Sequence, residues 1–278
     1  MPALTPAPTV ELANGVNMPR LGLGTWPMTD DEAAKAVATA LGTGYRLIDT
    51  AENYGNETGV GQGIRDAGVA RDDVFLTTKM NKKWHSVDGA RQACEASLGR
   101  LGLDYIDLFL IHWPNPDQGT YVEAFEGLTK LVDAGLVRAI GTSNFLPEHL
   151  KDLFAAGFVP HVNQIQLDPY HLRSDITAIH ADKGIVTESW SPIGRAGEML
   201  ADPAITGIAE AHGKTPAQTV LRWQVQSGYV PAPKSSDPAR QAQNLDVFDF
   251  ALTEAEMTVL NGLDRPDPGM LDANSFGH

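Results

Sequence analysis

The sequence predicts an α/β protein folded as a single (β/α)8, or TIM, barrel. Its 278 residues are close to the roughly 250 that such a barrel typically needs. Short β-branched apolar runs alternate with amphipathic segments of helical period along nearly the whole chain. No linker or shift in composition separates these units, so we expect one domain over residues 1–278.

Eight strands are expected, each from one apolar run that follows a helical segment or the N-terminus. Continuous apolar strands covered by helices favour parallel pairing with right-handed crossovers. Eight such units favour a closed barrel over an open sheet. In chain order the runs read LGLGTW, YRLIDT, DVFLTTK, IDLFLIHW, VRAIGTSN, HVNQIQLD, IVTESWSP and YVPAPKS.

Additional elements are expected at both ends of the barrel. VELANGVNM, with its Asn-Gly pair, predicts a β-hairpin with a type I′ turn before the first barrel strand, covering the N-terminal mouth. LTEAEMTVLNGL predicts an extra C-terminal helix that opens with a Thr-x-x-Glu cap. We expect residues 1–9 to be a disordered lead and residues 264–278 an irregular tail.

Composition and charge exclude several classes of function. The net charge of −14 disfavours nucleic acid, whose phosphates are bound mainly by Lys and Arg. No apolar run approaches the about 20 residues of a membrane span, and the N-terminus lacks the features of a signal peptide, so we expect a cytoplasmic protein. The single cysteine, Cys94, excludes an internal disulfide and fits a structural thiol. The histidines lack metal-ligand spacing, so no metal is expected, and no interface is evident, so we expect a monomer.

Polar or aromatic side chains stand near the ends of almost all strands. Chemistry in this architecture is done at the C-terminal strand ends. Each residue alone has an ordinary explanation, since a histidine after an apolar strand is often a satisfied core residue and a lysine there is usually solvated. Together they indicate a site, and in chain order they are Asp49, Lys79, His112, Ser143, Asn144, Gln164, Trp190 and Lys234.

Asp49, Tyr54, Lys79 and His112 form a plausible proton-delivery set for reducing a carbonyl group. The ammonium of Lys79 should bring the pKa of Tyr54 down from about 10 toward the working range. Asp49, from the neighbouring strand end, should keep a buried Lys79 charged. His112 is placed to donate a hydrogen bond to the carbonyl oxygen.

A series of motifs on successive strands extends this interpretation. The motifs are IDTAENYGNE, LTTK, LFLIHWP, IGTSNF, NQIQLDPY, ESWSP and the PKS and ARQAQN pair. In this order they resemble the aldo-keto reductase superfamily, from about Val10 to Gly262. The chain is most similar to the bacterial branch that includes 2,5-diketo-D-gluconate reductases. Trp190, where many mammalian relatives have tyrosine, fits that branch.

The resemblance implies an NADPH-dependent reductase of small aldehydes, dicarbonyls or keto-sugars. Tyr54 would donate the proton, Lys79 and Asp49 would tune it, and His112 would orient the substrate. The nicotinamide carboxamide would be bound by Ser143, Asn144 and Gln164, and its ring would stack on Trp190. The pyrophosphate would be bound by the backbone of Ser191, Ile193 and Gly194. The 2′-phosphate would be bound by Lys234, Ser235 and Arg240, and the adenine by Gln243 and Asn244.

The phosphate-binding segment also has a physical logic of its own. Lys234 and Arg240 flank a helix start at Pro238, so two cations and a helix N-terminus meet a phosphate, which favours NADPH over NADH. Asp237 departs from the family pattern: it either weakens this site or caps the helix, and we favour capping. Gln243 stands where relatives are acidic. The glycines of GVGQGI have the wrong spacing for a dinucleotide fingerprint and suit helix-packing or flexible positions.

Three tryptophans lie just beyond strand ends. Trp26 and Trp113 are expected to wall the substrate pocket, and Trp84 either joins them or only packs its loop.

Two other functions remain open. A regulatory protein that binds the cofactor with little turnover has the same fold, and a Schiff-base aldolase would use Lys79. The SN, NQ and ESWSP motifs argue against the aldolase.

Overall fold

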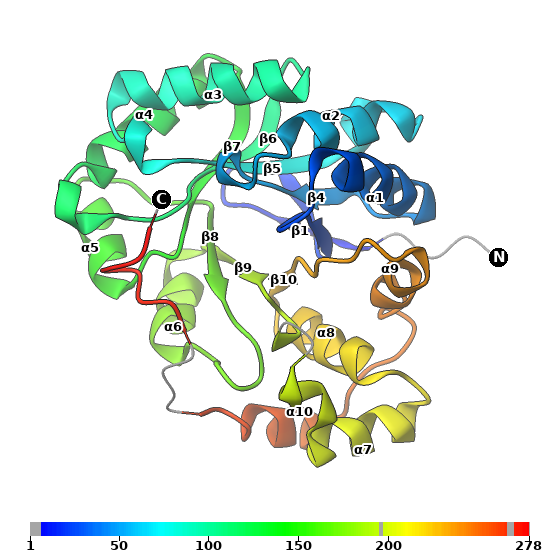
Figure 1. Cartoon of the computed structure of the whole chain (residues 1–278). Helices are drawn as coiled ribbons and strands as arrows, with labels where there is room; N and C mark the ends of the chain where they lie inside the picture. The colour runs from blue at the N-terminus through cyan, green and yellow to red at the C-terminus, as the bar shows by residue number, and fades with distance from the viewer. Residues whose placement is uncertain (1–6, 195–196, 266–269, 278) are drawn as a thin grey trace.

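The barrel is the central feature of the chain. The computed structural model describes residues 7–194, 197–265 and 270–277. Eight parallel strands run in the order β3 to β10, and a bridge between Gly24 and Lys234 joins the first strand to the segment after the last. Helices surround them (Figure 1). The strands are β3 Gly22–Gly24, β4 Leu47–Asp49, β5 Phe75–Met80, β6 Ile106–Ile111, β7 Val137–Ser143, β8 Val162–Gln166, β9 Val186–Trp190 and β10 Val230–Pro231. The predicted (β/α)8 barrel is confirmed.

The helices begin where the sequence supplies capping groups. Serine, threonine or aspartate side chains accept backbone N–H bonds at six helix starts, and proline stands in the first turn of several helices. The helices are α1 Asp30–Thr43, α2 Glu57–Asp66, α3 Val87–Leu101, α4 Tyr121–Asp133, α5 Pro147–Ala155, α6 Ser174–Lys183, α7 Pro203–His212, α8 Pro216–Gln226, α9 Pro238–Leu245 and α10 Glu254–Asn261. Two short 3-10 helices near the site are η1 Glu52–Tyr54 and η3 Lys82–Trp84.

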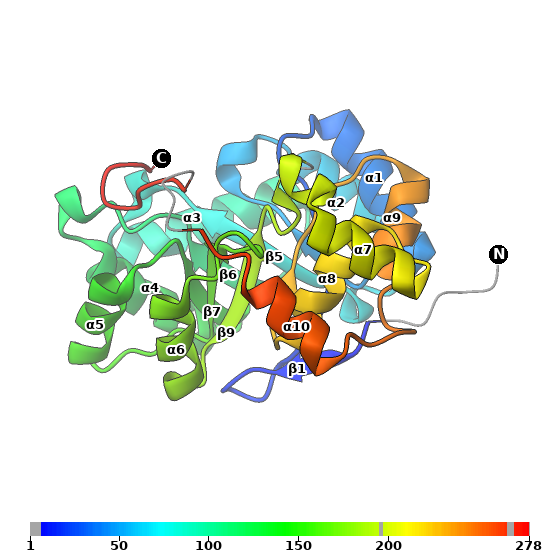
Figure 2. The ribbon, with the colours of Figure 1, turned by 90° about the horizontal axis from the view of Figure 1, so that it is seen from below.

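An N-terminal hairpin, β1 Thr9–Glu11 and β2 Asn17–Pro19, closes the bottom of the barrel. Leu12 and Met18 belong to the same buried apolar cluster as residues of six barrel strands. In Figure 2 the hairpin lies at the bottom and the C-terminal tail at the top. The hairpin therefore covers the mouth opposite the tail.

Two details of the N-terminus differ from expectation. The turn is not type I′, because only its glycine has a positive φ (83°) and the loop between the paired Leu12 and Val16 holds three residues. Thr9, expected in the disordered lead, pairs with Pro19 in the hairpin. Residues 1–6 of that lead lie outside the described residues.

The C-terminal segment ends near the open mouth of the barrel. The extra helix α10 begins at the expected capping box of Thr253 and Glu256. Beyond it, residues 264–265 and 270–277 contain no helix or strand, as expected for an irregular tail, while residues 266–269 and 278 lie outside the described part. Phe276 packs edge to face against Trp113, with 4.8 Å between the ring centroids. The tail therefore borders the candidate site.

Candidate active site

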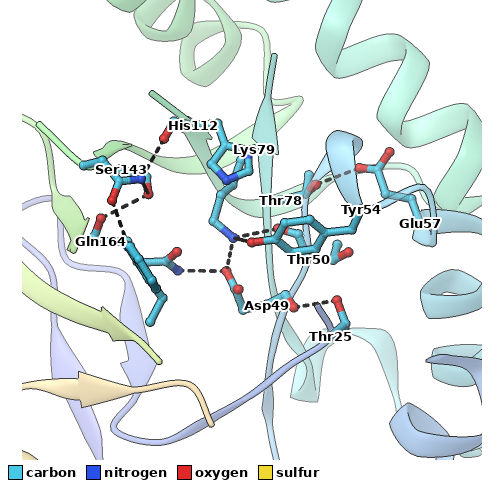
Figure 3. Close-up of polar contacts among 12 residues, drawn as sticks. Thr25, Asp49, Thr50, Tyr54, Glu57, Thr78, Lys79, His112, Ser143 and Gln164 are labelled. Carbon is cyan, nitrogen blue, oxygen red and sulfur yellow. Dashed lines mark hydrogen bonds and ion pairs between the residues drawn. The ribbon is translucent and has the colours of Figure 1, made fainter. Parts of the chain in front are cut away.

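Lys79 is the central residue of a buried polar cluster at the C-terminal mouth. Its side chain comes from β5 and is 0% exposed. Its ammonium lies 2.6 Å from Asp49 Oδ1, donates to the carbonyl oxygen of Thr50 at 2.9 Å and lies 3.4 Å from the Tyr54 hydroxyl. Figure 3 shows these groups converging on the ammonium. The expected pairing of Lys79 with Asp49 is present.

The charges of this cluster depend on one another. Burial opposes the charged form of Lys79, but Asp49 and then Tyr54 outweigh it and raise the pKa of Lys79 overall. For Tyr54 we expected a pKa brought down toward the working range, but the net shift is upward, although the ammonium of Lys79 itself acts in the expected direction. Burial is the largest cause and, with the Asp49 carboxylate, raises the pKa of Tyr54 despite the opposing charge of Lys79. The phenol is therefore protonated at neutral pH.

The segment from Thr50 to Glu57 is fixed by its own polar side chains. Thr50 Oγ1 donates to Asn56 Oδ1 at 2.8 Å, and Asn56 Nδ2 donates to the backbone carbonyls of Thr25 and Met28 in the segment after β3, at 3.2 and 3.0 Å. Glu57 accepts from Thr78 Oγ1 on β5 at 2.7 Å (Figure 3). Tyr54 therefore sits in a short turn that is anchored on both sides.

Glu52 makes a second set of contacts that sequence reasoning missed. Its carboxylate pairs with Lys83 Nζ at 2.7 Å and accepts from Trp84 Nε1 at 2.9 and 3.1 Å. It also accepts from the backbone N–H of Asn81 at 3.2 Å. These contacts connect η1, which carries Tyr54, to η3, so Trp84 packs its loop. The sequence feature that could have indicated these contacts is the glutamate two residues before Tyr54.

His112 and Trp113 follow β6 and lie on the other side of Tyr54. The His112 ring meets the Tyr54 ring edge to face, with centroids 5.7 Å apart and an interplanar angle of 75°. Trp113 is buried beneath the C-terminal tail, and its indole nitrogen has no hydrogen-bond partner among the described residues. Trp26, after β3, is 52% exposed. Of the two expected pocket walls, Trp113 is thus an inner side chain and Trp26 an outer one.

The residues expected to bind the nicotinamide carboxamide lie at the end of β7 and within β8, and Trp190, expected to stack on the ring, ends β9. Asn144, in the left-handed region with a φ of 63°, donates through Nδ2 to the His112 carbonyl at 3.1 Å and accepts from Trp190 Nε1 at 2.8 Å. Ser143 Oγ donates to the Gln164 carbonyl at 3.0 Å. The Gln164 side-chain Nε2 donates to Asp49 Oδ1 at 2.8 Å, which the sequence did not indicate.

The residues expected to bind the 2′-phosphate lie beside β3 and at the start of α9, and those expected to bind the pyrophosphate follow β9. Asp237 Oδ1 accepts the backbone N–H of Arg240 at 2.8 Å, so Asp237 caps α9, the interpretation that we favoured. Lys234 and Arg240 are exposed, and neither forms an ion pair within 7–194, 197–265 and 270–277. The remaining members vary in exposure, with Ser235 and Asn244 buried, Ser191, Ile193 and Gly194 half-buried and Gln243 exposed.

A further buried carboxyl group, Glu188 on β9, was not expected at the site. Its side chain is 0% exposed. Burial and then the charge of Asp49 raise the pKa of Glu188 to about 8. A charged residue in the middle of the apolar run IVTESWSP is the signal that could have marked it.

The described part of the chain offers neither a metal-binding cluster nor a membrane-spanning helix. No group of three or more His, Cys, Asp or Glu side chains is placed to hold a metal ion there. None of the described helices is long and apolar enough to cross a membrane. The polar cluster around Lys79, with its buried ion pair and adjacent tyrosine, is the candidate active site.

Comparison with known proteins places this geometry in a family. The sequence model of the aldo/keto reductase family matches residues 20–265. Morphine 6-dehydrogenase of Pseudomonas putida is 47% identical, with 97% of each chain aligned. 2,5-Diketo-D-gluconic acid reductase B of Corynebacterium sp. is 45% identical over 93% of this chain and 94% of that protein. The crystal structure of a Gox0644 variant in complex with NADPH has a TM-score of 0.93 at 42% identity, covering 99% of this chain and 100% of that one. The resemblance inferred from the motifs is confirmed.

Proposed function

The chain belongs to the aldo/keto reductase family, and from that premise we propose that it is an NADPH-dependent reductase of small aldehydes, dicarbonyls or keto-sugars. One observation carries the proposal: a protonated tyrosine, Tyr54, lies 3.4 Å from a buried ammonium, Lys79, that is paired with Asp49. Such a set suits delivery of a proton to a carbonyl oxygen. When bound, NADPH supplies the hydride.

The chain's own residues support the choice of NADPH. The two exposed cations, Lys234 and Arg240, stand around the N-terminus of α9, where the helix dipole also favours an anion. Asp237 turns its carboxylate to its own helix rather than to this space. At the other end, the half-buried Trp190 offers a ring face beside Asn144. We assign the 2′-phosphate to the first region and the nicotinamide to the second.

The proton comes from Tyr54 in this mechanism. Its raised pKa keeps the proton on the phenol until a carbonyl oxygen gains negative charge. The ammonium of Lys79 then stabilises the phenolate, and Asp49 keeps that ammonium charged inside the barrel. His112, edge to face with the tyrosine, orients the carbonyl oxygen.

The aromatic rim suggests the class of substrate. Trp26, Trp113 and Phe276 lie around the mouth of the site. They favour carbonyl compounds with an apolar or flat portion next to the reacting group. Two relatives are named as a dehydrogenase of morphine and a reductase of 2,5-diketo-D-gluconic acid, and the second of these substrates is a dicarbonyl compound. We further propose that the enzyme works in the cytoplasm as a monomer.

Two rival functions fit the geometry less well. A Schiff-base lysine has to lose its proton before it attacks a carbonyl group. Lys79 is held in the opposite state, since Asp49 raises its pKa despite burial. A regulatory protein without turnover has no need for the whole proton-delivery set, and all four residues are present here. Borohydride trapping of substrate on Lys79 would support the aldolase.

Tyr54→Phe tests the proposed function. Without the hydroxyl group, kcat for aldehyde reduction should fall by about two to four orders of magnitude, because the proton donor is lost. The affinity for NADPH, measured by the quenching of Trp190 fluorescence, should stay near the parent value. The affinity for NADH should remain weaker. Steady-state kinetics and the titration give the two readouts.

Tyr105→Phe is the matched control. Tyr105 lies just before β6, and its hydroxyl group bonds to Asp72 at 3.0 Å, at the opposite end of that strand from His112. This variant should keep parental kcat. Reduction by Tyr54→Phe at the parental rate would refute the catalytic assignment, and failure of the parent to bind either nucleotide would refute the cofactor.

A further inference from the structure

Glu188 is a buried carboxyl group to which the proposed reaction gives no role. Its side chain is 0% exposed on β9. Neither carboxyl oxygen has a hydrogen-bond partner among the described residues. A buried carboxylate without partners is costly, and most buried polar groups in proteins are paired. The position of Glu188 therefore needs an explanation.

The strand register turns Glu188 toward the inside of the barrel. Glu188 is the parallel partner of Gln164, whose amide reaches across the barrel to Asp49 on β4. The flanking Thr187 bonds to His180 on α6, and Ser189 bonds to a glutamine of α8, so both face the surrounding helices. Since successive side chains in a strand alternate between its faces, Glu188 points inward.

The charged groups that face Glu188 are those of the proton-delivery set. Asp49 of β4, Lys79 of β5 and Tyr54 of η1 all interact with its charge. On the adjacent strands, β8 presents the neutral amide of Gln164 and β10, a Val-Pro pair, has no ionisable residue. The Gln164 amide lies near enough to favour the carboxylate slightly, without a well-aligned hydrogen bond to it. Asp49 opposes the carboxylate.

On the premise of the proposed function, we infer that Glu188 is a positioning residue whose protonation state controls how readily Tyr54 releases its proton. When Glu188 is a neutral acid, Asp49 is the one carboxylate among the described residues that is ion-paired with Lys79. The ammonium of Lys79 can then stabilise the phenolate of Tyr54 as well. As a carboxylate, Glu188 adds a second negative charge, which raises the pKa of Tyr54. The neutral form is therefore the one that supports reduction.

The pH profile of Glu188→Gln tests this inference, because the amide keeps the shape of the side chain but cannot ionise. At saturating NADPH, kcat of the full-length parent should decline above about pH 8, as Glu188 loses its proton. The variant should lack this decline. At about pH 9, where roughly a tenth of the parent keeps the neutral acid, the variant should be up to about tenfold faster.

Glu123→Gln is the matched control for the change in net charge. It replaces an exposed carboxylate on α4 with the same amide. It should keep the parental decline. An unchanged decline in Glu188→Gln would overturn the inference. A loss of activity by the same factor at every pH would overturn it too, because a purely structural role predicts that result.

A second readout does not depend on turnover. The phenolate of Tyr54 can be followed by ultraviolet titration of cofactor-free protein, as the difference from Tyr54→Phe. Glu188→Gln should lower the pKa of Tyr54 relative to the parent, and an unchanged pKa would overturn the inference even in an active reductase. If the shift is present but no carbonyl compound is reduced, Glu188 still acts on Tyr54 and the proposed function is the part that fails.

Discussion

At the scale of single residues, burial decides the chemistry of the site. Lys79 would be a solvated cation on the surface, but inside the barrel it needs Asp49 to remain charged. Asp49 also accepts from the side chain of Gln164 on β8, which is four strands away from β4 and therefore across the barrel. The Asp49 carboxylate thus holds both Lys79 and Gln164 in place at the candidate active site.

Lys79→Met should destabilise the protein by about 3–5 kcal/mol, because it leaves the Asp49 carboxylate buried without its cation. The double variant Asp49→Asn with Lys79→Met should regain more than half of that loss, since no unpaired charge remains and the amide can still accept from Gln164. Urea unfolding of the parent, the single variants and the double variant measures this coupling. Equal stability of Lys79→Met and the parent would contradict it.

At the scale of elements, the close approach of α1, α2 and α3 determines where Tyr54 lies. The helix α2 starts three residues after Tyr54, so its seating fixes the turn η1. Its glycines allow backbone contact, because a Cβ atom at Gly59 would lie 2.0 Å from the carbonyl oxygen of Asp30, and one at Gly61 would lie 1.9 Å from that of Leu101. These glycines are packing positions, as the sequence suggested.

Gly61→Ala should therefore destabilise the protein by about 1–3 kcal/mol or more and lower kcat, because α2 has to move away from α3 and carries η1 with it. Gly99→Ala is the matched change in an exposed, open position of α3, with nothing within 4 Å of the added methyl group. It should stabilise the protein by about 0.5–1 kcal/mol through helix propensity. Thermal unfolding measures the stability of both variants, and steady-state kinetics gives their kcat. Similar effects of the two substitutions would contradict the claim that the position of α2 against α3 determines where Tyr54 lies.

At the scale of the whole molecule, closure of the barrel joins its first strand to the proposed 2′-phosphate site. Gly24 donates its backbone N–H to the Pro233 carbonyl at 3.1 Å and forms a parallel bridge with Lys234. The first strand thus meets the segment after the last one (Figure 1). This seam places a proposed phosphate-binding lysine next to the strand that leads to Trp26.

Gly24→Ala should open this seam, because its Cβ atom would lie 2.7 Å from the Ala232 carbonyl oxygen. We expect a loss of about 1–3 kcal/mol in stability and weaker NADPH binding, since Lys234 would move. Gly22→Ala is the control on the same strand, where the methyl group meets the Leu47 side chain at 2.6 Å instead. It should lower stability but leave the Kd for NADPH near the parent value. Equal loss of affinity in both variants would show that the seam is not responsible.

The sequence by itself determined the order of elements and most of the residues at their ends. Alternating strand and helix patterns favoured a parallel sheet, and eight such units favoured closure into a barrel. Asp49 and Lys79 could be found because strand ends of a barrel meet at one mouth, whatever the details of packing. Caps such as Thr253 and Asp237 are local interactions, so they too could be read from sequence.

Only the tertiary structure decided the balance of charges and the contacts across the barrel. The pKa of Tyr54 rises because burial outweighs a neighbouring cation, and no sequence pattern reports the depth of burial. The Gln164 to Asp49 hydrogen bond and the inward position of Glu188 depend on strand register and closure. Such contacts join residues far apart in the chain, and they exist only once all eight strands are in place.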